Sequence, residues 1–341
     1  MSAASGMAIQ KQSPKLTLAD RIDIIKNKRF FPLAFPLAML AVLVVLFAVL
    51  TGGQFLQGSV VKNVFNQSCI VGTMATAVAV IYSTGNIDFS VGNVMGLACV
   101  FGALAYEVTE SMPVMVAVTL VGGIALMMCN CTLCIACHIK PAMVAIVAMS
   151  IYSALCTVLV GADPIRVDYQ ASKALEGGFR YGTFILYFLV CLILYHRTAI
   201  GRKLRFIGGN ETCAVQTGIN TTKAQIIAFV FAGVGVGLAG VYQTIRTTSV
   251  AQTVGSGMGM DVMLATVLGG MSIFGGTKSN VYAGLIGAIT VTVLNTGLLM
   301  LGVSSTMIQG VRGVIFLLLV FLNSERQKTC LLYTSDAADE L

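Results

Sequence analysis

Between Phe31 and Asn323 the chain alternates long apolar segments with short polar connections. Most of these segments contain no Lys, Arg, Asp or Glu, and an uncharged apolar run of roughly 18 or more residues can cross the hydrocarbon core of a bilayer as a helix. We therefore predict an all-α, polytopic membrane protein with about ten transmembrane helices. The predicted spans are residues 33–50, 63–82, 88–106, 114–137, 141–160, 181–195, 224–245, 260–274, 280–300 and 307–323.

The composition excludes a water-soluble domain. Hydrophobic residues make up 57% of the 341 residues and charged residues 10%, whereas soluble domains carry about 25% charged residues. The net charge of +7 is spread over several connections and forms no single basic face, which argues against a nucleic-acid partner. The 36 glycines fit helix packing in a bilayer, where small residues let backbones approach closely.

The basic residues fall mainly on one side of the predicted membrane path. That side, which includes both termini, carries Lys11, Lys15, Arg21, Lys26, Lys28, Arg29, Lys140, Arg197, Arg202, Lys203, Arg205, Lys223, Lys278, Arg326 and Lys328. The opposite side carries Lys62, Arg166, Lys173, Arg180 and Arg246. Because cytoplasmic connections are enriched in Lys and Arg, we predict that both termini are cytoplasmic. An even number of spans agrees with this orientation.

Outside the apolar region the chain has two polar ends. Residues 1–30 are basic and show no cleavage site for a signal peptide, so we expect a cytoplasmic tail, either plain or with an amphipathic surface helix. Residues 31–323 form one transmembrane domain, and residues 324–329 a second cytoplasmic tail. Residues 330–341 resemble the translation of an adapter used in sequencing libraries and are treated as not native.

Three short motifs resemble cofactor sites but lie in the wrong context. Cys134–His138 spells C-x-x-C-H, an attachment sequence for haem, at the cytoplasmic end of a span where cysteines suit close packing. Gly235–Gly240 matches the dinucleotide pattern G-x-G-x-x-G within an apolar run, and the spacing of Gly233 and Gly237 favours helix packing. Gly270–Ser279 resembles a P-loop with its lysine out of register. We therefore predict no metal, no cofactor, no catalytic residue and no ATP binding by this chain.

The longest cytoplasmic connection, residues 196–223, contains the signals of a short helix. Asn210 is a favourable N-cap, Glu211 suits the first turn, and Gly218 can end the helix in the left-handed conformation. We predict a two-turn helix outside the membrane, entered through two glycines. A plain solvated connector is the alternative.

This connection also resembles that of a known family. Its residues are similar to the cytoplasmic loop of the permease subunits of bacterial ABC importers for ribose, other monosaccharides and autoinducer-2, and further motifs of that family follow in order along residues 31–323. The matching positions are Gly201-Arg202, Ile207–Glu211, Ala214, Gly218-Ile219, Asn86–Gly92, Leu268–Gly276 and Asn295–Gly297. Two departures, Asn86 for a glycine and Thr277–Asn280 for a more glycine-rich connector, bear on loop geometry and not on the family.

The resemblance implies a transport subunit of the bacterial plasma (inner) membrane without an ATPase site of its own. A separate cytoplasmic ATP-binding subunit would bind ATP and receive the short helix, and an extracytoplasmic sugar-binding protein would deliver a monosaccharide to residues 161–180. Two permease chains, as a homodimer or as a heterodimer with a paralogue, would share one path. The residues expected to couple to the ATPase are Gly201, Arg202, Gly208, Gly209, Asn210, Glu211, Ala214 and Gly218.

Polar residues within or beside the spans are the candidates for the substrate path, because an unpaired polar group in hydrocarbon is costly and so faces a wet cavity or a partner. They are Asp88, Ser90, Asn93, Gln243, Asp261, Asn295, Gln309 and Arg312. Two structural alternatives stay open: Asp261 and Arg312 pair to fix helix packing, or Asp88 caps the helix that follows it.

Two other classes of function compete with an ABC importer. An ion-coupled secondary sugar transporter would need acidic residues in several spans, and only Asp261 is clearly placed in one. A membrane enzyme would need a polar catalytic cluster at one membrane face, and the sequence shows none. The substrate stays open among pentoses, hexoses and autoinducer-2.

Overall fold

The computed structural model describes residues 31–271, 275–276 and 279–323. The predicted tails and part of the Gly270–Ser279 motif therefore lie outside the described residues. The described chain is helical apart from one short pair of strands, which confirms the predicted all-α class. Its helices are α2 (Phe31–Leu50), η1 (Gln54–Leu56), α3 (Gly58–Tyr82), α4 (Val91–Thr109), α5 (Met112–Cys137), α6 (Pro141–Val160), α7 (Tyr169–Glu176), α8 (Gly178–Arg197), α9 (Ala199–Gly209), α10 (Glu211–Gln216), α11 (Thr221–Thr247), α12 (Met258–Leu268), α13 (Tyr282–Met300) and α14 (Ser305–Asn323), and its antiparallel strands are β1 (Ile165–Arg166) and β2 (Ser249–Val250).

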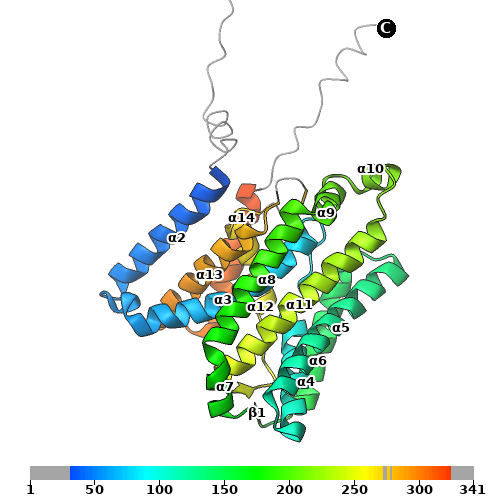
Figure 1. Ribbon diagram of the computed structural model, residues 1–341. Helices are drawn as coiled ribbons and strands as arrows, with labels where there is room; N and C mark the ends of the chain where they lie inside the picture. The colour runs from blue at the N-terminus through cyan, green and yellow to red at the C-terminus, as the bar shows by residue number, and fades with distance from the viewer. Residues whose placement is uncertain (1–30, 272–274, 277–278, 324–341) are drawn as a thin grey trace, which may run out of the picture.

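Seven of the described helices are long and apolar enough to cross a membrane: α3, α4, α5, α6, α8, α11 and α13. Helices α2, α12 and α14 contain shorter apolar stretches, and with the seven they coincide with the ten predicted segments. Figure 1 shows the start of α2, the end of α14 and helices α9 and α10 at one end of the bundle, with α7 and β1 at the other. The charge pattern assigns the first end to the cytoplasm. Ten complete crossings and cytoplasmic termini stay predictions.

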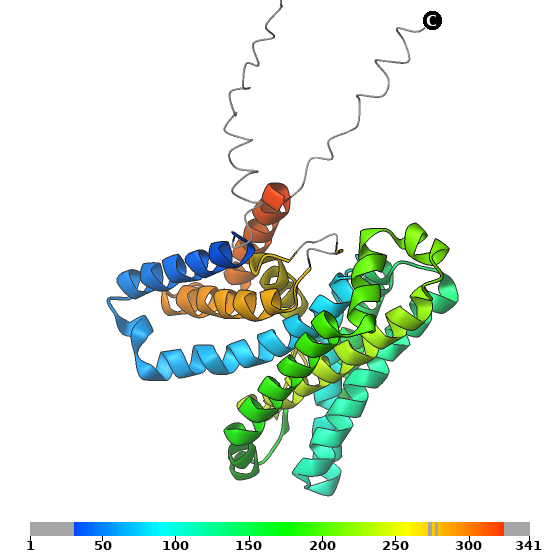
Figure 2. The same cartoon turned by 45° about the horizontal axis from the view of Figure 1, so that its top comes forward.

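The helices form two groups that meet at α3 and α12. In Figure 2, α13 lies between α2 and α3 on one side of the molecule, and α14 rises beside them. The other group contains α4, α5, α6 and α11. Helix α12 touches α13 and α14 in the first group and α4 in the second. This short helix therefore lies where the two groups join.

Two predicted spans have different boundaries because the helix is interrupted. The predicted span over 260–274 is the 11-residue helix α12, which ends at Leu268 in a turn through two glycines. The predicted span over 88–106 begins as a helix only at Val91. Hydropathy follows composition along the chain, so it cannot detect where glycines and side-chain hydrogen bonds turn the backbone.

Close glycine contacts hold the centre of the bundle together. Helix α3 is buried at every residue from Ser68 to Tyr82. Helix α11 packs against α5 so closely that a Cβ atom on Gly123 would lie 2.7 Å from the Cα atom of Gly237, and one on Gly233 would lie 2.7 Å from that of Ile124. These contacts confirm the helix-packing interpretation of Gly233 and Gly237.

Gly237→Val is expected to destabilise the protein without altering the substrate path. Its Cβ atom would lie 2.9 Å from the Cα atom of Leu120 and 3.1 Å from the carbonyl oxygen of the same residue, and overpacking of this kind costs about 1–3 kcal/mol. Thermal unfolding of the detergent-solubilised protein would show a lower midpoint. Gly182→Val is the matched control, because no atom lies within 4 Å of the Cβ position at this exposed glycine of α8. Equal midpoints for the two variants would contradict the packing argument.

Candidate functional site

Helix α12 begins inside the protein because the loop before it is built from glycines. Gly255 and Gly257 adopt φ angles of +80° and +76°, a left-handed conformation that glycine adopts without strain. The same loop lies directly on α4: a Cβ atom on Gly92 would lie 2.5 Å from the Gly259 nitrogen and 2.7 Å from the Gly255 oxygen. With 11 residues, α12 is roughly 16 Å long, about half the hydrocarbon thickness.

Four of the predicted path residues converge at the start of this half-length helix. Arg312 Nη1 lies 2.9 Å from Asp261 Oδ1, and Arg312 Nε donates to Asn295 Oδ1 at 2.9 Å. Asn295 Nδ2 lies 3.5 Å from both carboxylate oxygens of Asp261. Gln309 completes the set, because a Cβ atom on Gly257 would lie 3.4 Å from Gln309 Nε2. We call Asp261, Asn295, Gln309 and Arg312 the α12 cluster.

The α12 cluster offers hydrogen-bonding groups without net charge. The Asp261 and Arg312 side chains are 7% and 14% exposed and neutralise each other, while Gln309 is exposed on α14. Discontinuous helices that end near the middle of the bilayer, with polar groups gathered at the break, commonly form substrate sites in transporters. The geometry fits a neutral, hydroxylated substrate. The same contacts join α12 to α13 and α14. The Asp261–Arg312 pair therefore suits both a role in substrate contact and a role in helix packing.

Asp88 and Ser90 belong to a second, fully buried hydrogen-bond chain. Asp88 Oδ1 accepts from the Ser90 backbone nitrogen at 2.8 Å and from Ser90 Oγ at 2.6 Å. Asn130 Nδ2 donates to Ser90 Oγ at 2.9 Å, and the Tyr152 hydroxyl donates to Asn130 Oδ1 at 2.7 Å. The Asp88 carboxylate thus binds the backbone nitrogen of Ser90, the N-cap residue of α4, and accepts no hydrogen bond from the helix itself. The chain also ties this turn to α5 and α6.

Asn130 and Tyr152, which belong to this hydrogen-bond chain, were not among the predicted path residues. The available signal was Asn130 itself, a lone amide among cysteines in an apolar span, which needs a partner when buried. This hydrogen-bond chain lies close to the start of α12. Phe89 lies between Asp88 and Ser90, and its carbonyl oxygen lies against Gly259 of α12. Of the other two predicted path residues, Asn93 is half-buried on the first turn of α4 and follows Gly92, which packs against Gly259, and Gln243 lies towards the β2 end of α11.

The predicted short helix outside the membrane is present as α10. The Asn210 side chain accepts a hydrogen bond from the Cys213 backbone nitrogen at 3.0 Å, and Gly218 adopts a φ angle of +79° after the helix. These contacts confirm the predicted N-cap and the glycine stop. Glu211 is exposed on α10, whereas Ala214 is fully buried against the protein itself. Val215, 56% exposed, is an apolar outward-facing residue that the sequence prediction did not include.

Helix α9 connects α10 to the interrupted part of the bundle. A Cβ atom on Gly208 would overlap the Ser83 carbonyl oxygen and lie 2.7 Å from the Gly276 nitrogen. Gly276 in turn donates to the same Ser83 oxygen at 3.0 Å. Glycine at 208 therefore lets α9 rest directly on the end of α3 and on the segment that follows α12. Arg202 and Gly209 are exposed, and Gly201 is buried at the start of α9.

The cysteines and acidic residues offer no metal centre within the described residues. Across 31–271, 275–276 and 279–323 no group of three His, Cys, Asp or Glu side chains is placed to hold a metal ion. The C-x-x-C-H cysteines are free: Cys134 is buried in α5, and Cys137 is exposed just before His138 ends the helix.

Comparison with known proteins identifies the family. Residues 60–320 match the family model described as "branched-chain amino acid transport system / permease component". The chain is 28% identical to the ribose import permease protein RbsC of Escherichia coli over 317 residues, covering 89% of this chain and 98% of that protein. It is 30% identical to RbsC of Bacillus subtilis over 302 residues (85% and 92%) and 29% identical to the fructose import permease protein FrcC of Rhizobium meliloti over 286 residues (80% and 79%).

The matched region contains both the α12 cluster and α10. No solved structure matches the chain. The apolar helices and the family together make this a multi-pass protein of the bacterial inner membrane. The chain belongs to the family of branched-chain amino acid transport system permease components.

Proposed function

We propose that this chain forms the membrane path of an ATP-driven importer for a monosaccharide, with ATP bound by a separate cytoplasmic subunit. The observation that carries the proposal is the chain of contacts from α10 through α9 to the end of α3, the helix against which α12 packs. The capped, exposed helix α10 adjoins α9, and α9 rests through Gly208 on the end of α3 and on Gly276. A force on α10 would thus reach α3, which packs against α12.

The proposed cargo is neutral and hydroxylated. The names of the relatives, ribose import permease and fructose import permease, describe such cargo, and the α12 cluster supplies amide and guanidinium donors and carboxylate and amide acceptors without net charge. An ion-coupled transporter would need further buried carboxylates. Asp88 and Asp261 are the buried acidic residues of the described chain, and each already accepts hydrogen bonds or pairs with Arg312.

Two copies of the permease would share one path, with α14 facing it. Gln309 and Gly310 are exposed in the N-terminal half of α14. They place a polar and a small residue on the surface next to the α12 cluster. Such residues suit close helix contact or a wet path more than contact with lipid. The copies would be a homodimer or a pair with a paralogue, and an extracytoplasmic sugar-binding protein would dock at the end that carries α7.

Glu211→Arg and Val215→Arg are expected to prevent binding of the ATP-binding subunit. Both side chains are exposed on α10, and a misplaced charge in a docking surface weakens binding by about tenfold or more. Co-purification of the two subunits and ATP-dependent sugar uptake into proteoliposomes would both be lost. Glu107→Arg makes the same charge change at the far end of α4, on an exposed residue, and should leave co-purification intact.

The same proteoliposomes test the competing class of function. Uptake that requires ATP, the ATP-binding subunit and the binding protein supports the proposal. Uptake by the chain alone, driven by an ion gradient and unchanged in Glu211→Arg, would establish a secondary transporter instead.

A further inference from the structure

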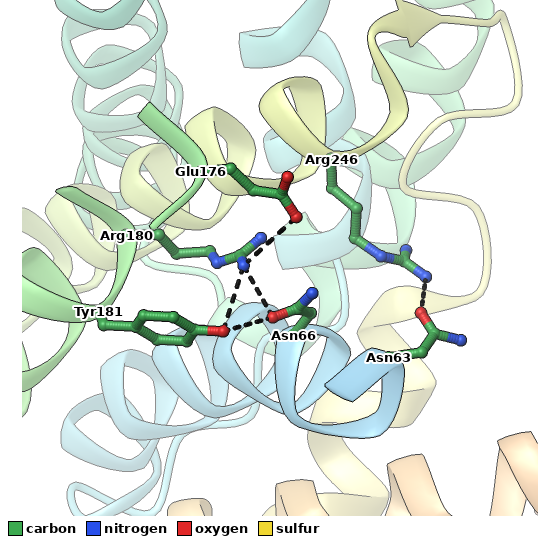
Figure 3. A network of polar contacts seen from close by, with 6 residues as sticks. All are labelled: Asn63, Asn66, Glu176, Arg180, Tyr181 and Arg246. Carbon is green, nitrogen blue, oxygen red and sulfur yellow. Dashed lines mark hydrogen bonds and ion pairs between the residues drawn. The ribbon is translucent and has the colours of Figure 1, made fainter. Parts of the chain in front are cut away.

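Arg180 is a buried charge that the proposed path does not use. The side chain is 1% exposed in the first turn of α8, at the end of the bundle opposite α10. Its Nη2 atom lies 2.7 Å from Asn66 Oδ1, 3.4 Å from the Tyr181 hydroxyl and 3.7 Å from Glu176 Oε1 (Figure 3). Nη2 thus makes each of these polar contacts, and the guanidinium carbon lies 5.0 Å from the centre of the Tyr181 ring. Nε and Nη1 are buried without a hydrogen-bond partner among the described residues.

A second arginine lies in the same group. Arg246, at the end of α11, donates to Asn63 Oδ1 at 3.0 Å, and Figure 3 shows it on the other side of Glu176 from Arg180. We call Asn63, Asn66, Glu176, Arg180, Tyr181 and Arg246 the Arg180 cluster. Buried charges are normally fully hydrogen-bonded, so Arg180 is incompletely paired in this conformation.

Two glutamines beside the cluster each have a side-chain oxygen without a hydrogen-bond partner in the described structure. Gln67 follows Asn63 by four residues on α3, and Gln243 precedes Arg246 by three residues on α11, so each lies one turn deeper on the same helix face. The Oε1 atoms of both are buried without a partner in the described part of the chain. Unpaired donors on α8 and unpaired acceptors on α3 and α11 therefore occur where these three helices meet.

We propose that the Arg180 cluster is an outer binding site for a polyhydroxylated ligand, which under the proposed function is the sugar before it reaches the α12 cluster. A hydroxyl group donates and accepts, so neighbouring hydroxyls satisfy Arg180 and the glutamines together. A carboxylate only accepts and would leave the glutamine oxygens unpaired, and a cation would be repelled by two arginines. The cluster already holds one hydroxyl: that of Tyr181 accepts from Arg180 and donates to Asn66 Oδ1 at 2.7 Å.

Binding would replace this internal hydroxyl by those of the ligand. The Tyr181 side chain is half-buried at the edge of the cluster, so it can swing away while Asn66 and Arg180 keep their positions on α3 and α8. The site needs the outer end of the bundle to open, since the unpaired atoms are enclosed in the present conformation. A sugar that binds there takes the place of the Tyr181–Asn66 hydrogen bond between α8 and α3.

A single tryptophan would report on binding. The chain contains no Trp, and Phe65, which is 54% exposed, places its ring 5.8 Å from that of Tyr181. Phe65→Trp therefore puts the one tryptophan of this chain beside the moving side chain, and the same preparation without the substitution gives the background fluorescence to subtract. The full chain with its ATP-binding subunit, in nanodiscs, would be titrated with D-ribose, D-fructose, D-xylose and D-galactose. A saturable change is expected for the sugar that the same two proteins, with the binding protein, take up into proteoliposomes, and tetrahydropyran, a ring without hydroxyls, should give none.

Variants in the Phe65→Trp background separate binding from structure. Gln243→Met and Gln67→Met each remove one acceptor and should weaken sugar binding about threefold to tenfold. Their thermal midpoints should fall little, because a buried oxygen without a hydrogen-bond partner contributes no stability. Arg180→Met should weaken binding by about tenfold or more. Lys62→Met, which removes an exposed cation on α3 at the same end of the molecule and outside residues 161–180, should leave binding unchanged.

The outcomes distinguish this inference from the proposed function. ATP-dependent uptake without a saturable fluorescence change, or with unchanged affinity in Gln243→Met and Arg180→Met, would overturn the outer site and leave the importer assignment intact. Absence of ATP-dependent uptake would overturn the proposed function itself.

Discussion

Arg312→Met is expected to abolish sugar uptake and to lower the stability of the protein. Asp261 is a buried residue, 5% exposed, and the substitution removes the guanidinium that lies 2.9 Å from its carboxylate. It also removes the donor to Asn295 Oδ1. Breaking a buried ion pair by removing one partner costs about 3–5 kcal/mol. Thermal unfolding in detergent and ATP-dependent uptake into proteoliposomes would measure the two effects.

The double variant Asp261→Leu with Arg312→Met separates packing from transport. Replacing both members of a buried pair by apolar side chains is often neutral for stability, so the thermal midpoint should recover. Uptake should stay lost, because a hydroxylated sugar that leaves water needs hydrogen-bonding partners along its path. Recovery of uptake together with stability would contradict this prediction and leave the pair with a role in helix packing alone.

Elements that depend on local signals could be predicted from the sequence. The helix at α10 is defined within ten residues by an N-cap, an acidic first turn and a left-handed glycine, and Asn210, Glu211 and Gly218 occupy these positions in the structure. The apolar segments were equally clear, since hydropathy averages over a whole helix. Local patterns of this kind do not require knowledge of neighbouring helices.

Contacts between distant segments could be predicted only in part. The polar residues of the α12 cluster were identifiable because polar groups in spans need partners, but their convergence depends on the interrupted helix at Gly255 and Gly257. Arg180 illustrates the limit most clearly. The charge count placed it among outer connections, whereas α8 begins at Gly178 and buries the arginine against Asn66. A one-turn shift of a helix start turns an exposed charge into a buried one.

Gly208→Val is expected to uncouple ATP hydrolysis from transport. Glycine at this position brings α9 into direct backbone contact with the end of α3, where the Ser83 carbonyl oxygen also accepts from the Gly276 nitrogen. A valine Cβ atom would overlap that oxygen, and because both neighbours are backbone atoms they cannot move aside as a side chain would. The relief of such an overlap costs about 1–3 kcal/mol. It would displace α9 from the segment that follows α12.

The uncoupled variant should still bind the ATP-binding subunit, because α10 and its exposed residues are unchanged. The permease would therefore still stimulate ATP hydrolysis by that subunit, while the amount of sugar taken up per ATP falls. A variant that fails to bind the subunit, such as Glu211→Arg, would lose both. Gly182→Val repeats the substitution at a helical glycine with no atom within 4 Å of its Cβ position and should keep normal coupling. Normal uptake per ATP in Gly208→Val would exclude the α9–α3 contact as the route from α10 to α12. The contacts of α9 with α8 and α11, and of α10 with α11, would then remain as connections to the bundle.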